Sequence, residues 1–342
     1  MGKSITVFLF ACLAASAQGT ISGPSLGLMY DPAVKAIRPI LGVPGSASVG
    51  KPFDLGFNVS AAAISPTQAF ALAISDGGSL NLVTFAAGAA SAQPLNSAAT
   101  PDRMVLSASG SSAVLYYKTG GVQILTGLPA SPQIGSRIDV TALPGAPGAL
   151  AVSDDGAVLL AGLSEPPPNI AGRRPRSHRQ TSNGLFIIPA DGSAPQSVSA
   201  QHVSALAFMP NSHDALVADS RSNSITLIRD IAGQSTAAWT FTDPGLIAPD
   251  AVAASVDGKT ILAASSTTGI LARFDSSGAN PVFVPCKCTP TELLAMTAPA
   301  VYQVTEPANG LLWIFDSNPA NPRVLFVPVS SGASAGMGTD TQ

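Results

Sequence analysis

The sequence predicts an all-β fold, a β-propeller with seven blades of about four antiparallel strands each. Three observations lead to this prediction: a repeat of blade length, short apolar runs, and tight turns between the runs. In each repeat an apolar run is followed by a small polar turn and a second apolar run. The residues that open these turns are Ser65, Ser107, Ser153, Met209, Ser255 and Thr297. Their intervals are 42, 46, 56, 46 and 42 residues, and four of the five lie near the length of one propeller blade.

Further apolar runs complete the repeats. A third run follows each pair, at 80–85, 122–127, 184–189, 224–230, 269–275 and 311–316. A weaker fourth run follows most of them, for example at 237–242, 281–285 and 323–329. Asp-Gly pairs such as Asp155-Gly156 stand in the turns, where glycine supplies a positive φ. Short strands joined by such turns are typical of an all-β chain, and no segment carries a sustained helical period.

The blade count rests on the N-terminal stretch. Six repeats account for residues 61 to about 329, and residues 18–60 have the length of one more. Within that stretch, 25–31 resembles the third-strand run at 311–316. We therefore expect a degenerate seventh blade that closes the ring near the C-terminal strands, because an open ring would leave an unpaired apolar edge. Six blades with an N-terminal arm are the alternative.

The N-terminus predicts export. Lys3 is followed by an apolar run from Ile5 to Ala15 and by the small residues Ala15-Ser16-Ala17, which is typical of a signal peptide cleaved after Ala17. A lipoprotein with Cys12 as the modified residue is the alternative. The apolar run is too short to span a bilayer, and no later run is long enough. We expect a secreted or periplasmic protein, monomeric, with a single propeller domain at 18–329 and a disordered tail at 330–342.

The composition fits a folded chain with few charges. Hydrophobic residues make up 46% and charged residues 11% of the sequence, which is ample apolar content for a core. Without the signal peptide the formal charge is 16 − 20 = −4, because Lys3 is removed. An acidic exported chain is a poor partner for nucleic acid.

Two segments resemble a known repeat family. ALAVSDDGAVLLAG (149–162) and AVAASVDGKTILAAS (251–265) are similar to the repeat of YVTN/lactonase-like β-propellers. The resemblance covers six of the seven units, but Pro stands only in the first and fourth turns and Asp-Gly only in the third and fifth. It implies a propeller whose ligand sites lie on the face of the loops that lead into the innermost strands. It does not imply one activity, since the fold hosts many functions.

The longest interval contains an insertion at 164–183. This segment holds three consecutive prolines and a basic cluster, Arg173, Arg174, Arg176 and Arg179. We expect a solvated loop in a hairpin connection. Docking onto an anionic polymer or a lipid headgroup is one alternative, and cleavage by a trypsin-like protease is another. The loop has no aromatic residue to stack on bases, which argues against nucleic acid.

Four polar residues precede the predicted innermost strands at matching offsets: Asp102, His202, Asp250 and Glu292. If the ring closes, they could converge at the mouth of the central channel. Three carboxylates and an imidazole could hold a divalent cation such as calcium, zinc or manganese. The alternative is that each side chain bonds amides of neighbouring loops, as turn residues commonly do.

Cys286 and Cys288 lie on the same predicted face. In an oxidising compartment they are expected to form a disulfide. The disulfide either stiffens the loop before the last blade or serves as a redox pair. Two cysteines without a second pair of ligands do not make a zinc site.

No catalytic motif stands out, so a binding role is favoured. We expect a non-catalytic scaffold that binds a protein, a glycan or an envelope component. The alternative, which the family resemblance allows, is a lactonase- or quinoprotein-like enzyme with a metal or cofactor in the funnel of the propeller. In that enzyme Asp102, His202 and Asp250, together with Glu292, would be the ligands, and one carboxylate would act as general base.

Overall fold

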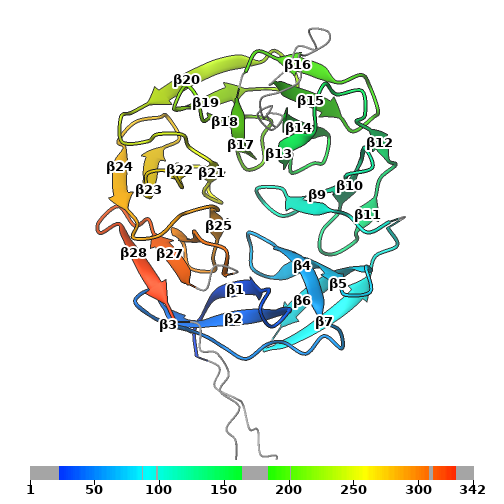
Figure 1. Cartoon of the computed structure of the whole chain (residues 1–342), viewed down its shortest axis with the longest axis vertical. Coiled ribbons are helices and arrows are strands. Elements are labelled where there is room, and N and C mark those ends of the chain that lie inside the picture. The colour runs from blue at the N-terminus through cyan, green and yellow to red at the C-terminus, as the bar shows by residue number, and fades with distance from the viewer. Residues whose placement is uncertain are drawn as a thin grey trace, which may run out of the picture.

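A computed structural model shows the predicted seven-bladed β-propeller (Figure 1). The structure describes residues 23–86, 88–97, 99–163, 184–200, 202–307 and 311–328. The predicted signal peptide, the arginine-containing insertion and the C-terminal tail lie outside these residues. Seven antiparallel sheets follow one another around a central channel, in chain order.

The strands of the first four blades are as follows. Blade 1 contains β1 (Ser25–Asp31), β2 (Ala36–Val43) and β3 (Ser46–Val49). Blade 2 contains β4 (Val59–Ile64), β5 (Phe70–Ser75), β6 (Leu80–Ala86) and β7 (Ala89–Pro94). Blade 3 contains β8 (Arg103–Leu106), β9 (Ala113–Tyr117), β10 (Gly121–Thr126), β11 (Gln133–Ile134) and β12 (Ile138–Asp139). Blade 4 contains β13 (Pro147–Val152), β14 (Val158–Leu163), β15 (Leu185–Pro189) and β16 (Gln196–Val198).

The other three blades have four strands each. Blade 5 contains β17 (Val203–Phe208), β18 (Ala215–Asp219), β19 (Ser224–Arg229) and β20 (Thr236–Thr242). Blade 6 contains β21 (Ala251–Ala254), β22 (Thr260–Ser265), β23 (Ile270–Asp275) and β24 (Val282–Pro285). Blade 7 contains β25 (Leu294–Ala295), β26 (Val301–Gln303), β27 (Leu312–Asp316) and β28 (Arg323–Val327). In blades 2 to 7 the first strand is the innermost one.

The serine recurs in the repeats because it closes the first hairpin of a blade with two hydrogen bonds. It directly follows the innermost strand, and its amide donates to the carbonyl five residues later, as from Ser153 to Val158 (2.9 Å). Its hydroxyl also accepts a hydrogen bond from the amide of that same residue, Val158 (3.0 Å). The same pair of bonds closes the hairpins that begin at Ser65, Ser107 and Ser255. In blade 7 the equivalent amide bond runs from Met296 to Val301, so the repeat position is Met296 rather than Thr297.

The core consists of layers between adjacent blades. Side chains of β14 alternate between two such layers: Leu159 packs with blade 3 residues such as Val114, and Leu160 packs with blade 5 residues such as Val217. The second strands β5 and β14 are buried along their whole length. Because both faces of these strands are covered by neighbouring blades, their sequences are continuous apolar runs.

Blade 1 is degenerate in a way that the sequence did not predict. The amide of Thr297, in the hairpin that follows β25, donates to the carbonyl of Leu26 at the start of β1. The hydroxyl of Tyr30, near the end of β1, donates to the carbonyl of Val59 at the start of β4. Strand β1 therefore runs opposite to the innermost strands, and 25–31 occupies the second-strand place rather than the expected third. Among the described residues, no strand fills the innermost place of blade 1.

Gln68 closes the ring at this place. Its side-chain oxygen accepts a hydrogen bond from the amide of Leu28 in blade 1 (2.6 Å). Its side-chain nitrogen donates to the carbonyl of Ala295 in blade 7 (2.6 Å). Gln68 itself follows the innermost strand of blade 2, so one buried side chain connects three blades. Leu26 and Met29 of β1 also pack against Ile314 and other core residues of blade 7.

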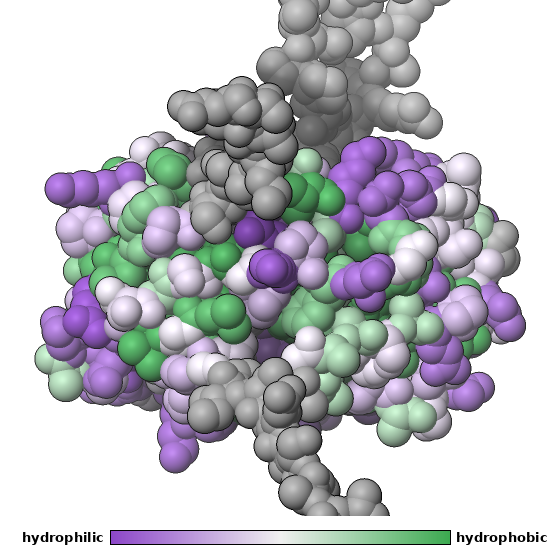
Figure 2. Space-filling model, turned by 90° about the horizontal axis from the view of Figure 1, so that it is seen from below, coloured by the Kyte–Doolittle hydropathy of each residue, from purple (hydrophilic) through white to green (hydrophobic). Residues whose placement is uncertain are grey.

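The outer surface carries scattered apolar side chains. Figure 2 shows the rim of the ring, where polar and apolar residues are interspersed. Leu41 and Val43 of blade 1 and Phe326 of blade 7 are the exposed large hydrophobic residues of β2 and β28. Among the described residues there is no helix long and apolar enough to cross a membrane.

Candidate functional site

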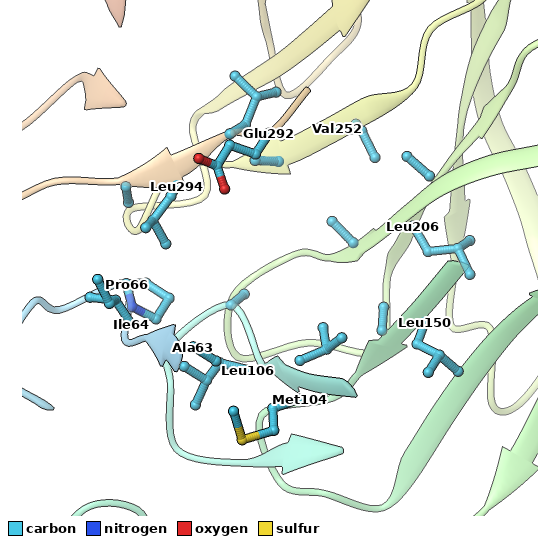
Figure 3. Close-up of a pocket in the computed structure, with 18 of the residues that line it drawn as sticks. Ala63, Ile64, Pro66, Met104, Leu106, Leu150, Leu206, Val252, Glu292 and Leu294 are labelled. Atoms are coloured by element: carbon cyan, nitrogen blue, oxygen red, sulfur yellow. The ribbon is translucent and has the colours of Figure 1, made fainter. Parts of the chain in front are cut away.

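The central channel contains a cavity of about 730 Å³. The innermost strands of blades 2 to 7 line it along their length, and blade 1 contributes Tyr30 and Pro32. Most of its lining is apolar, including Ile64, Met104, Leu106, Leu150, Leu206 and Val252 (Figure 3). All four residues of β8, and residues 204–207 of β17, are only half-buried although they lie inside the ring. Apart from Arg103 and Ser204 these residues are apolar, and their accessible surface lines the channel.

Polar groups gather at one end of the channel. Arg103 stands at the start of β8, Ser204 near the start of β17, and Glu292 shortly before β25. Glu306 and Pro307, in the connection between β26 and β27, line the same end. Figure 3 shows the carboxylate of Glu292 directed into the pocket among the labelled apolar side chains. This end of the channel is the candidate site.

Glu292 is held by a neighbouring glutamine. The side-chain nitrogen of Gln303 donates to Glu292 Oε1 (2.6 Å) and to the carbonyl of Thr305 (3.3 Å). Gln303 Oε1 is buried and has no hydrogen-bond partner within the part of the chain that the structure describes. Burial raises the pKa of Glu292 to about 7, the hydrogen bond from Gln303 opposes this shift, and the charge of Glu306 adds to it.

Arg103 was not singled out from the sequence. Its Nη1 donates to the carbonyl of Gly148 (2.6 Å), its Nη2 approaches the carbonyl of Pro147 (3.4 Å), and its guanidinium lies over the ring of Tyr116. Burial lowers its pKa. The signal that could have identified it is a charged residue that opens the apolar run RMVL of an innermost strand.

Asp102 and Asp250 serve the hairpins of their own blades. Asp102 Oδ2 accepts from the amide of Lys118 (2.7 Å), and both oxygens of Asp250 accept from the amide of Ser266 (3.1 and 3.2 Å). The hydroxyl of Ser266 also donates to Asp250. These bonds are the local role that the sequence offered as the alternative to a metal site.

His202 also bonds within its own blade. Its Nε2 lies 2.9 Å from Nη1 of Arg221, and its carbonyl accepts from the amide of Ser220. Neither His202 nor the two aspartates are among the lining residues of the channel, whereas Glu292 is. The described residues contain no group of three or more His, Cys, Asp or Glu side chains that could hold a metal ion. The structure therefore does not bring the four predicted ligands together.

A shift of one residue separates Glu292 from the two aspartates. The amides of Asp102 and Asp250 donate to Tyr116 and Ala264, and in blade 7 the equivalent bond runs from Thr291 to Val304. Thr291 is thus the counterpart of the aspartates, and Glu292 is the counterpart of Arg103. A one-residue shift in an extended segment turns a side chain to the other side. This shift places Glu292 in the channel wall.

Cys286 and Cys288 form a disulfide, with their Cα atoms 5.0 Å apart. The carbonyls of both cysteines lie against Gly269, in the hairpin between β22 and β23, where an added Cβ would be 3.0 and 3.3 Å from them. The bridge packs against the core between blades 6 and 7. The arginines at 173, 174, 176 and 179 lie outside the described residues, so their predicted docking role stays a prediction.

The comparisons with known proteins support the fold alone. No family model and no curated protein matches the sequence. A functionally unknown protein of Desulfotomaculum acetoxidans has a similar structure, with a TM-score of 0.56 and 14% identity over 90% of this chain and 100% of that one. A "putative 6-phosphogluconolactonase" of Bacteroides fragilis has a TM-score of 0.57 and 15% identity, over 89% and 92% of the two chains. The β-propeller domain of Cps50 (Swd1) from Myceliophteria thermophila has a TM-score of 0.53 and 14% identity, over 87% and 98%.

Together the fold and these comparisons define a seven-bladed β-propeller, whose structural neighbours include a protein of unknown function and a "putative 6-phosphogluconolactonase". At identities of 14 and 15% the neighbours do not assign an activity to this chain.

Proposed function

We propose that this protein is a non-catalytic binding module that holds a small ligand with an apolar body in its central channel. The observation that carries the proposal is the apolar, half-buried lining of a cavity of about 730 Å³. Ligand sites in proteins are commonly concave, largely apolar and of this size, with a few polar groups that fix orientation.

The apolar lining would supply most of the free energy of binding. Each 100 Å² of apolar ligand surface removed from water contributes about 2.5 kcal/mol before the costs of association. Small residues such as Ala63 and Ala253 leave room between the larger side chains of Met104 and Leu206. A ligand with an extended apolar part would therefore gain most of its affinity along the channel wall.

Binding is favoured over catalysis by the polar groups of the wall. The described lining residues include the carboxylates of Glu292 and Glu306 and the guanidinium of Arg103, but no His or Cys. The Nη atoms of Arg103 bond backbone carbonyls, and the side-chain nitrogen of Gln303 bonds Glu292 and Thr305. These groups suit recognition of one polar head better than activation of a nucleophile.

The proposal is tested with Nile red, a neutral apolar dye, in a fluorescence titration. Leu206→Trp would fill the channel and is expected to weaken dye binding at least tenfold. Leu41→Trp, the same change on the outer surface, should leave binding unchanged. Binding that is not saturable, or that Leu206→Trp does not alter, would refute the proposal.

A hydrolase is the second candidate, and the pKa of Glu292 favours it. A carboxyl whose pKa is about 7 is suited to general acid–base catalysis at neutral pH. If it acts in this way, the purified protein should hydrolyse simple lactones or esters, and Glu292→Gln should abolish the activity. Equal rates for the two proteins would remove this candidate.

Export remains part of the proposal. It is supported by the signal-like sequence at 1–17, which lies outside the described residues. The mature protein should be found outside the cytoplasm with Gln18 at its N-terminus. A cytoplasmic chain that keeps residues 1–17 would contradict export without affecting the channel.

A further inference from the structure

We infer that the ligand of the channel is an organic cation, an apolar chain or ring that carries a protonated primary amine bound at Glu292. This inference rests on the proposed function and deepens it by naming the head group. It follows from three features of the polar end of the channel.

The first feature is the negative charge of Glu292. No cation among the described residues forms an ion pair with it, and its one hydrogen bond comes from a neutral amide. Glu306, at the same end of the channel, is a second acidic group. A carboxylate in partly buried, apolar surroundings is stabilised by an opposite charge. A cationic ligand would supply the charge that the described chain lacks at this position.

The second feature is the acceptor left over on Gln303. Both side-chain hydrogens of Gln303 are used, by Glu292 and by Thr305, and this fixes which end of the amide faces Glu292. The remaining oxygen, in a side chain that lines the channel and is 3% exposed, has no described partner. A buried acceptor without a donor costs free energy. An ammonium group carries three donors, so it can serve a carboxylate and an amide oxygen together.

The third feature is the orientation of Arg103. It is the positive charge at the same end of the channel, but its Nη atoms point to the carbonyls of Gly148 and Pro147 and its face to Tyr116. Among the described residues it forms no ion pair with Glu292, and its Nη atoms are turned toward the backbone of blade 4, while its Nε is buried without a described partner. Because Arg103 belongs to blade 3 and Glu292 to blade 7, the acidic side of the mouth is left to the ligand.

The test uses ligands with one tail and four heads: octylamine, octyltrimethylammonium, 1-octanol and octanoate. Binding to the purified protein is measured by displacement of Nile red at pH 8, where Glu292 is mostly ionised. Octylamine should bind at least tenfold more tightly than 1-octanol, and octanoate should bind most weakly. Octyltrimethylammonium has the charge without donors, and should fall between octylamine and 1-octanol.

Two variants complete the test. Glu292→Gln should remove the preference for octylamine and leave the affinity for 1-octanol within about twofold. Glu306→Gln, which removes the exposed neighbouring charge, should keep most of the preference. If wild type binds octylamine and 1-octanol equally, or if Glu292→Gln keeps the preference, the inference is wrong while the proposed function stands. If none of the four ligands displaces the dye, the inference fails, whereas the proposed function fails only if Nile red itself does not bind or if Leu206→Trp does not weaken its binding.

Discussion

Glu292 differs from Asp102 and Asp250 in the partners that its position provides. The two aspartates meet backbone amides of a hairpin in their own blade. Glu292 lies one residue further along its blade and meets a side-chain amide at the wall of an apolar channel. Burial among apolar groups disfavours the ionised form, which accounts for its raised pKa.

The raised pKa of Glu292 predicts how the stability of the protein depends on pH. The ordinary pKa of a glutamate carboxyl is 4.5, and that of Glu292 in the native state is about 7. Between these two pH values the native state keeps a proton on Glu292 that the unfolded chain releases. This contribution to stability is therefore present at low pH and is lost as the pH rises through 7. In urea unfolding, Glu292→Gln should be about 1–3 kcal/mol more stable than wild type at pH 8 and nearly unchanged at pH 4. A variant that is less stable than wild type at pH 8 would contradict this.

Asp250 leads to a second prediction about stability, because its carboxylate accepts hydrogen bonds within the hairpin of its own blade. Asp250→Ala leaves the amide and hydroxyl of Ser266 without their acceptor, and should lower the free energy of unfolding by about 1–2 kcal/mol. Asp250→Asn keeps one acceptor oxygen and should recover part of the loss. Thermal melts in chelator and in calcium, manganese or zinc should coincide for wild type. A metal-dependent rise in melting temperature that Asp250→Ala abolishes would instead support the predicted metal site.

At the scale of strands, the sequence predicted most elements because each hairpin carries its own signal. A serine such as Ser153 closes the first hairpin with its amide and hydroxyl, and the strands around it are apolar on both faces. These are local properties. The place of 25–31 in blade 1 is not local, because second and third strands are both apolar runs and a strand of either kind can end in Asp, as β18 and β27 do. Only the contacts of Leu26 and Tyr30 with other blades fix its direction.

At the scale of strands, a substitution of Gln68 tests how the ring is closed. Gln68→Ala removes both bonds that connect blade 2 to β1 and β25, and leaves the buried amide of Leu28 and carbonyl of Ala295 without these partners. We expect a loss of about 2–4 kcal/mol in chemical denaturation. Gln93→Ala, on the exposed strand β7, is the matched control and should change stability by less than about 0.5 kcal/mol. Similar losses for the two variants would show that the bonds of Gln68 do not stabilise the contacts of blade 1 with blades 2 and 7.

At the scale of the whole molecule, the ring and its blade number follow from repeat length, but the character of the channel does not. The repeat shows that innermost strands surround an axis. Whether their side chains fill that space depends on how far seven blades hold them apart, which is a tertiary property. The half-buried Met104 and Leu206 reveal the open apolar wall, and the one-residue shift that turns Glu292 into it is visible only in the hydrogen bonds of blade 7.

The most direct test of the channel as a cation site is a crystal structure of the protein with octylamine at pH 8. The account predicts the amine nitrogen within about 2.7–3.2 Å of the Glu292 carboxylate, and the alkyl chain along Met104 and Leu206. Octylamine bound elsewhere on the ring, or in the channel with its nitrogen turned away from Glu292, would contradict it.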